Sequence, residues 1–97
     1  MDEALIHQIK DGDEDAFELM VIKYRPRILA SLLRYTSSRE LSEDLTQQTF
    51  LRVWEKIDTF KGNSALSTWI YSISINLARN YYVCLLYTSD AADDLLC

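Results

Sequence analysis

Carboxylate and amide side chains recur at helical spacing in the middle of this chain, where their chemistry suits binding to another protein. Asp44, Gln47 and Leu51 are three or four residues apart, so a helix would place them on one face, with Gln48 on its flank. Oxygen acceptors around an apolar centre suit a partner helix that carries arginine. An ordinary solvated face above a buried stripe explains the same residues equally well.

The segment that follows, residues 59–83, has the opposite character because it contains Lys61 and Arg79 but no acidic residue. Tyr71 and a set of amide and hydroxyl side chains lie between these two basic residues. Such groups suit stacking and hydrogen bonding to nucleic-acid bases, with a basic residue near each end for phosphates. A plain surface helix is the alternative, and for Trp69 packing in the core is the better interpretation. The neutral hydrogen-bonding residues are Asn63, Ser64, Ser67, Thr68, Ser72, Ser74, Asn76 and Asn80.

Long helices are the elements expected to position these side chains. The 97 residues include two glycines and one proline, too few turn residues for a many-stranded β fold. Because 48% of the residues are apolar, a core of patterned helices is expected. We therefore predict an all-α fold, a compact bundle of about four helices.

Helix ends are predicted from capping residues. Asp13 suits the start of a second helix, and Pro26 within it predicts a kink or two stacked segments. Ser37 with Glu40 is a capping-box pattern that would open the third helix. A turn at residues 62–64 precedes the fourth helix, which Asn63 or Ser64 would cap.

The spacing of apolar residues predicts the buried face of each helix. In the second helix that face includes Tyr35. In the fourth it consists of Leu66, Trp69, Ile70, Ile73 and Leu77. The residues then expected to point outward or obliquely are Tyr71, Ser74, Ile75, Ala78 and Tyr82.

The net charge of −5 is unevenly divided along the chain. Residues 19–39 contain five bases and no acid, whereas residues 1–18 and 40–58 are acidic overall. A polyanion meets local surfaces and not the total charge. The negative total therefore does not exclude a nucleic-acid partner.

The residue types needed for most catalytic and metal sites are missing. His7 is the only histidine, and both cysteines, Cys84 and Cys97, lie after residue 83. These positions exclude a zinc cluster and a Ser/His/Asp triad. A glycine-rich phosphate loop is absent as well. We predict no enzymatic activity, no metal and no cofactor. No apolar run is long enough to cross a bilayer, and the acidic N-terminus is not a signal peptide, so a cytoplasmic location is expected.

The composition changes after Val83. The string CLLYTSDAAD that begins at Cys84 resembles the conceptual translation of transposase-based sequencing-adaptor DNA. An ordinary acidic C-terminal extension is the alternative. We predict one domain at residues 1–83 and a non-native tail at residues 84–97, which is left out of functional interpretation. The codons of the encoding DNA would decide between the two.

Three strings together carry a family resemblance. They are DGDEDAFELMVIKYRPRIL (11–29), SEDLTQQTFLRVWEKIDTFKG (42–62) and NSALSTWIYSISINLARNYYV (63–83). In order and spacing they resemble region 2 of the bacterial sigma-70 superfamily, specifically the extracytoplasmic-function group. The resemblance implies part of a sigma factor, a non-enzymatic protein that directs RNA polymerase and helps to open the promoter.

The resemblance also implies a polymerase contact. In the family, the helix that matches residues 42–54 docks on the clamp-helix coiled coil of the β′ subunit, and Phe50 and Trp54 would support that helix. An anti-sigma factor is a further partner that is common in the family. The implied polymerase-binding residues are Asp44, Gln47, Gln48 and Leu51.

Promoter DNA is the second partner that the resemblance implies. In the family, the loop that matches residues 60–66 captures a base flipped out of the non-template strand of the −10 element. The helix that matches residues 67–82 follows the same element. The implied loop residues are Lys61, Asn63 and Ser64. The implied helix residues are Tyr71, Asn76, Arg79 and Asn80.

Two departures from the family pattern limit what is expected. Ser72 stands where members often carry a basic residue, so we expect weak DNA binding that is sensitive to salt. The second helical domain, which reads the −35 element in the family, has no counterpart in these residues, so normal promoter initiation is expected to be poor. A helical protein–protein module that never touches DNA is the competing interpretation.

Overall fold

The structure is a computed structural model that describes residues 2–88, with side chains described for residues 3–83. It contains helices α1 (Asp2–Lys10), α2 (Glu14–Thr36), α3 (Arg39–Lys56) and α4 (Leu66–Thr88), with a 3₁₀ turn, η1 (Ile57–Thr59), after α3. No strand occurs within residues 2–88, and the predicted all-α bundle of about four helices is confirmed. Over the same range, no helix has the length and apolar character needed to cross a membrane.

Capping explains where α2 begins and where it gives way to α3. The carboxylate of Asp13 accepts hydrogen bonds from the backbone N–H groups of Asp15 (3.0 Å) and Ala16 (3.2 Å), as predicted. The prediction for α3 is wrong by one residue, because Ser38 is its cap and accepts from the backbone N–H of Leu41. Ser37 instead closes α2 in the left-handed conformation, with φ of 60°. A residue in that conformation cannot also have the extended backbone that an N-cap requires.

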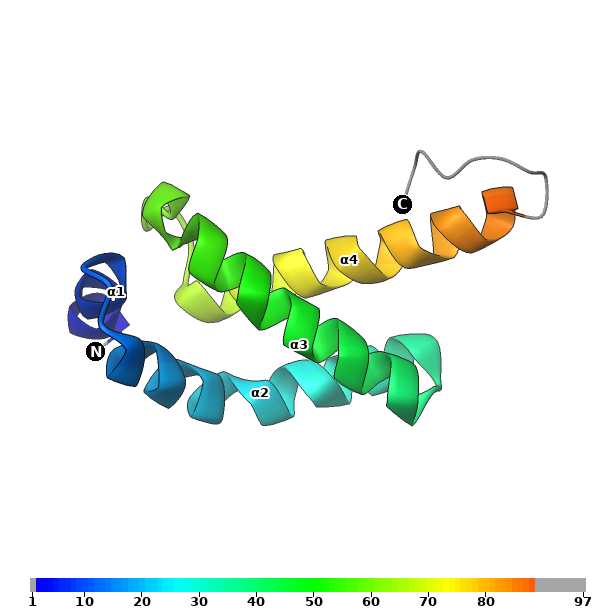
Figure 1. Ribbon diagram of the computed structural model, residues 1–97, viewed down its shortest axis with the longest axis horizontal. Coiled ribbons are helices and arrows are strands. Elements are labelled where there is room, and N and C mark those ends of the chain that lie inside the picture. The colour runs from blue at the N-terminus through cyan, green and yellow to red at the C-terminus, as the bar shows by residue number, and fades with distance from the viewer. Residues whose placement is uncertain (1, 89–97) are drawn as a thin grey trace.

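Pro26 does not divide α2. The helix continues through it from residue 14 to residue 36, so of the two alternatives expected, a kink or two stacked segments, the second is wrong. Figure 1 shows α2 as one bowed helix that lies along α3. Pro26 is exposed, so the backbone carbonyl that loses its partner can bond to water.

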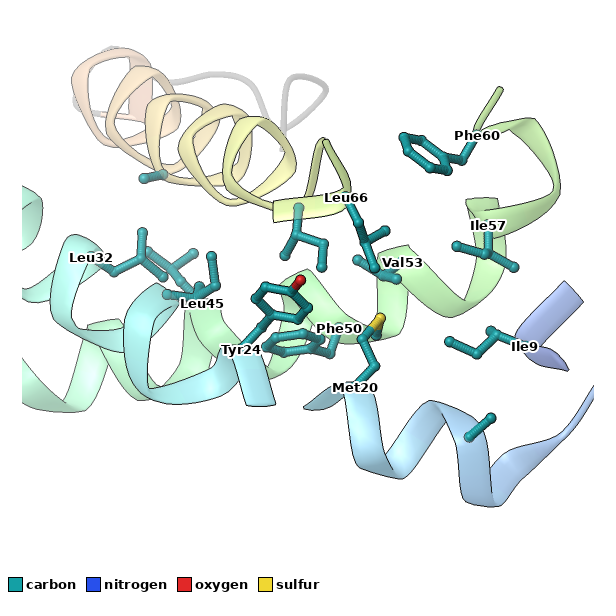
Figure 2. Packing of buried hydrophobic residues seen from close by; sticks show 14 residues of the cluster. Ile9, Met20, Tyr24, Leu32, Leu45, Phe50, Val53, Ile57, Phe60 and Leu66 are labelled. Carbon is teal, nitrogen blue, oxygen red and sulfur yellow. The ribbon is translucent and has the colours of Figure 1, made fainter. Parts of the chain in front are cut away.

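The core lies where α3 packs against both α2 and α4 (Figure 1). Met20 of α2, Val53 of α3 and Ile70 of α4 are fully buried, and each fully buried side chain of this size contributes about 1.5–3 kcal/mol. Helix α1 packs against α2 and η1. Figure 2 shows Ile9 of α1 pointing into the cluster near Ile57, so α1 closes the end of the core next to the η1 turn.

The buried face of α4 is rotated from the predicted one. Ser74 and Ala78, expected to point outward or obliquely, are completely buried, whereas Trp69, Ile73 and Leu77 are only half-buried. Helices pack at a distance set by the side chains between them, and small residues fit where two helices lie close together. The hydroxyl of Ser74 donates to the backbone carbonyl of Tyr71 at 2.7 Å, which satisfies its burial.

Helix α3 follows the same rule. Its buried side includes Ser42, Thr46 and Thr49, all completely buried and none of them part of an apolar stripe. The hydroxyls of Thr46 and Thr49 donate to the backbone carbonyls four residues earlier, each at 2.7 Å. Hydropathy alone therefore misses the small polar residues of this core.

Two further expectations fail at the ends of helices. Tyr35 is 44% exposed and packs against Tyr82 with ring centroids 5.9 Å apart, so it does not belong to the buried face of α2. Helix α4 begins at Leu66, after Ala65, and the hydroxyl of Ser64 donates to the Ala65 carbonyl at 3.4 Å. The turn at residues 62–64 is present, with Gly62 at φ +80°, but Ser64 and Asn63 lie too early to be the N-cap.

Candidate functional site

The polar face of α3 is formed as predicted. Asp44, Gln47, Gln48 and Leu51 are all exposed, Leu51 by 58%. At about 100° per residue they span roughly 100° of the helix surface. The side-chain amide of Gln48 donates to Asp44 at 2.9 Å, which orients the carboxylate on this face. The face thus offers one negative charge, two amides and an apolar centre.

Aromatic side chains support this face from below. Phe50 is buried, and Trp54 packs edge-to-face against Phe17 of α2, with ring centroids 4.8 Å apart. Beside Leu51, a shallow hollow of about 280 Å³ opens between α2 and α3. A knob-like side chain of a partner helix fits such a hollow. The residues that line it are Phe17, Val21, Arg25, Gln47, Phe50 and Leu51.

A second hollow brings together all three predicted loop residues. Lys61, Asn63 and Ser64 are exposed and line an open hollow of about 140 Å³ together with Thr59 and residues from both sides of the loop. One ammonium, one amide and one hydroxyl provide donors and acceptors for the edge of a planar base. The structure therefore brings these three residues together in one hollow, while their function stays a prediction.

The apolar wall of this loop hollow was not predicted. Phe60 is buried beneath the loop, and Trp69 reaches it from the second turn of α4, with ring centroids 4.9 Å apart. Figure 2 shows Phe60 at the edge of the core cluster, on the loop side. Trp69 was expected to serve the core alone, but it lines the loop hollow as well. An aromatic wall of this kind suits a stacked base.

Lys10 connects the first helix to the loop. Its ammonium donates to the backbone carbonyl of Phe60 at 2.8 Å, although the two residues are 50 positions apart. The bond fixes the peptide group that leads into Lys61. No signal in the sequence marks this contact, because it depends on how α1 packs against η1.

Replacement of Lys10 by methionine is expected to loosen the loop while the helices stay folded. Methionine keeps an apolar stem of similar length but cannot donate, so the Phe60 carbonyl must bond to water instead. The free energy of unfolding should fall by about 1 kcal/mol, and amide hydrogen exchange at residues 60–64 should accelerate severalfold. Lys56→Met, at an exposed position on α3, is the matched control. Equal exchange rates in the two variants would contradict a positioning role for Lys10.

The four predicted DNA contacts on α4 do not form one patch. Tyr71, Asn76, Arg79 and Asn80 are all exposed. At about 100° per residue, however, Tyr71 and Asn80 lie roughly 180° apart around the helix and about 13 Å apart along it. The exposed surface therefore divides into one side with Asn76, Arg79 and Asn80, which are three or four residues apart, and another with Tyr71. A single bound strand contacts both sides only if it crosses over α4.

Comparison with known proteins assigns this arrangement to a family. The sequence model described as Sigma-70 region 2 matches residues 20–84, which include the α3 face, the loop hollow and the exposed residues of α4. The chain belongs to the sigma-70 region 2 family. Sigma factors are not enzymes, and the family thus agrees with the predicted lack of catalysis.

Curated relatives of this region 2 domain include a sigma-E factor of the extracytoplasmic-function group and a sigma-H factor. The ECF RNA polymerase sigma-E factor of Haemophilus influenzae is 38% identical over 80 residues, which are 82% of this chain and 42% of that protein. The RNA polymerase sigma-H factor of Pseudomonas aeruginosa is 35% identical over 82 residues, which are 84% of this chain and 42% of that protein. The chain spans less than half the length of these relatives.

A solved structure has the same fold. It is the NMR structure of a complex formed by an engineered region 2 of sigmaE with GTAAAA. Its TM-score to this chain is 0.81 at 32% sequence identity, and the similarity covers 91% of this chain and 92% of that one. The recognised resemblance to region 2 of an extracytoplasmic-function sigma factor is thereby confirmed.

The division of the chain at residue 83 stays a prediction. The family match ends at residue 84, and the backbone of α4 continues to Thr88. Residues 89–97, which hold most of the tail that resembles adaptor DNA, lie outside the described residues.

Proposed function

We propose that this region 2 domain docks on the β′ clamp helices of RNA polymerase through α3 and binds the non-template strand of the promoter −10 element through the loop hollow and α4. The observation that carries the proposal is the loop hollow itself. Lys61, Asn63 and Ser64 meet the Phe60–Trp69 pair there, at the start of a helix without acidic residues. A solved relative with the same fold is described as a complex with the strand GTAAAA.

The strand-binding half of the proposal depends on capture of one unstacked base. Extruding a base costs a few kcal/mol, which contacts in the hollow must offset. Stacking on Trp69 and hydrogen bonds from Asn63 and Ser64 are the contacts available. Because Lys61 and Arg79 are the two basic residues of residues 59–83, the domain alone should bind DNA weakly and lose affinity as salt rises.

The polymerase-binding half depends on the α3 face. Asp44 and its hydrogen-bonded Gln48 offer acceptors to a basic partner helix, and the hollow beside Leu51 offers an apolar socket. The domain would act in the cytoplasm with the polymerase core, and an anti-sigma factor is a further partner in this proposal. Reading of a −35 element would require a second domain.

Two binding measurements on the unaltered chain test the proposal. Fluorescence anisotropy should detect sequence-dependent binding of labelled GTAAAA, and one abasic substitution should reduce its affinity far more than any other. A pull-down should recover a β′ clamp-helix fragment. Binding to the clamp helices without any strand binding would favour the protein–protein module instead. Absence of both activities would overturn the proposal.

A further inference from the structure

A third hollow lies between α2 and the first turns of α4, apart from the α3 face and the loop hollow. Its volume is about 280 Å³, twice that of the loop hollow. We call it the α2–α4 groove. The residues that line it are Tyr24, Arg27, Ile28 and Ser31 of α2 and Ser67, Thr68 and Tyr71 of α4.

The groove combines an aromatic floor with an exposed aromatic wall. Tyr24 is 3% exposed and forms the floor, whereas Tyr71 is 46% exposed on the opposite side. Ser31, Ser67 and Thr68 also line the groove, whose surface is mostly apolar. The exposed ring of Tyr71 offers a surface on which a flat base can stack, and stacking of this kind tolerates any base sequence.

Arg27 lines the groove on the α2 side, and Lys23 lies near Tyr24 without lining the groove. The guanidinium carbon of Arg27 lies 5.9 Å from the centroid of the Tyr24 ring, and the ammonium of Lys23 lies 5.2 Å from it. Arg34, seven residues after Arg27, falls on the same stripe of the helix. Neither residues 19–39 nor residues 59–83, the two segments that form the groove, contain an acid. The charge therefore complements a polyanion.

The groove is also continuous with the proposed DNA surface. Ser64 and Trp69 line the loop hollow, and Ser67, Thr68 and Tyr71 line the groove, so both hollows use the first two turns of α4. A strand held by one base in the loop hollow can pass over Thr68 into the groove. An acidic protein partner would also meet the charge, but an exposed tyrosine on a mostly apolar groove favours a nucleotide base.

We propose that the α2–α4 groove holds a further nucleotide of the same single strand, outside the loop hollow. Its base stacks on Tyr71 above Tyr24, and its phosphate contacts Arg27. This inference rests on the proposed function, because it concerns the same strand. It assigns strand contacts to α2, a helix that the sequence did not implicate in DNA binding.

The first test removes one charge at a time and measures salt dependence. The probe is a labelled twelve-nucleotide strand with GTAAAA at its centre and thymidines on both sides. Arg27→Gln should weaken binding by roughly fivefold and reduce the slope of log K against log salt by about 0.7. Arg52→Gln on α3 removes the same charge from an exposed position and should change neither quantity. Equal behaviour of the two variants would overturn the groove proposal.

The second test locates the strand. Bromodeoxyuridine is placed at each strand position in turn, and crosslinks to the peptide that contains Tyr71 or Tyr24 are mapped. The position that gives these crosslinks should differ from the position at which an abasic site reduces affinity most. If both signals fall on the same position, the groove holds no separate nucleotide. If no crosslink to the groove peptides forms while one abasic site still reduces affinity, the groove proposal is overturned and the proposed function stands. A chain that binds no strand at all overturns both.

Discussion

Replacement of Asp44 by arginine is expected to abolish capture of the β′ clamp helices. The substitution reverses the one negative charge of the α3 face and removes the acceptor for Gln48. Loss of one partner from a desolvated charge pair costs about 2–5 kcal/mol, so affinity should fall about thirtyfold or more. Because Asp44 is exposed, the free energy of unfolding should change by no more than about 0.5 kcal/mol.

The measurement is recovery of the clamp-helix fragment at several salt concentrations. Asp44→Asn, which removes the charge but keeps the shape, should give an intermediate affinity. Glu3→Arg on α1 makes the same change of charge at another exposed position and should leave recovery unaltered. Recovery of Asp44→Arg equal to that of the unaltered chain would count decisively against docking through α3.

The combined variant Tyr71→Ala, Arg79→Gln and Asn80→Ala is expected to lose strand binding and to keep polymerase binding. An aromatic side chain that stacks on a base contributes about 1–3 kcal/mol, and a phosphate contact adds to this. A total near 3 kcal/mol corresponds to a loss of about a hundredfold in affinity for GTAAAA. All three residues are exposed, so the core remains intact.

This variant and Asp44→Arg together form a crossed pair. Each should lose one activity and retain the other, in anisotropy with the strand and in the pull-down. The single variants add a further distinction, because Tyr71 and Asn80 lie on opposite sides of α4. If the strand stays on the Tyr71 side, Asn80→Ala alone will have no effect. A combined variant that binds the strand normally would remove α4 from the DNA surface.

Much of the local structure could be predicted because it depends on neighbours within one or two helical turns. The Asp13 cap, the polar α3 face and the turn at residues 62–64 all follow from residue types at short spacing. The Ser37–Ser38 pair shows the limit of this reasoning. Both serines can cap α3, and the need to close α2 with a left-handed residue decides between them.

The rotation of α4 could not be predicted from its own hydropathy. Ser74 and Ala78 are buried since they are small enough to lie where two helices meet, and the larger Trp69 is displaced toward the loop hollow. Hydropathy ranks residues by polarity, whereas close packing selects them by volume as well. The same rotation places Trp69 in the wall of the loop hollow.

The sequence by itself determined that about four helices form, where the second of them begins, and that an acidic, amide-bearing face precedes an acid-free helix. These are properties of side chains close together along the chain. Only the tertiary structure decided that Lys10 holds the Phe60 carbonyl across 50 residues, and that Arg27 and Tyr71 border one groove. Such contacts depend on the angle and distance at which helices pack, and these are set by the volumes of side chains that are remote in sequence.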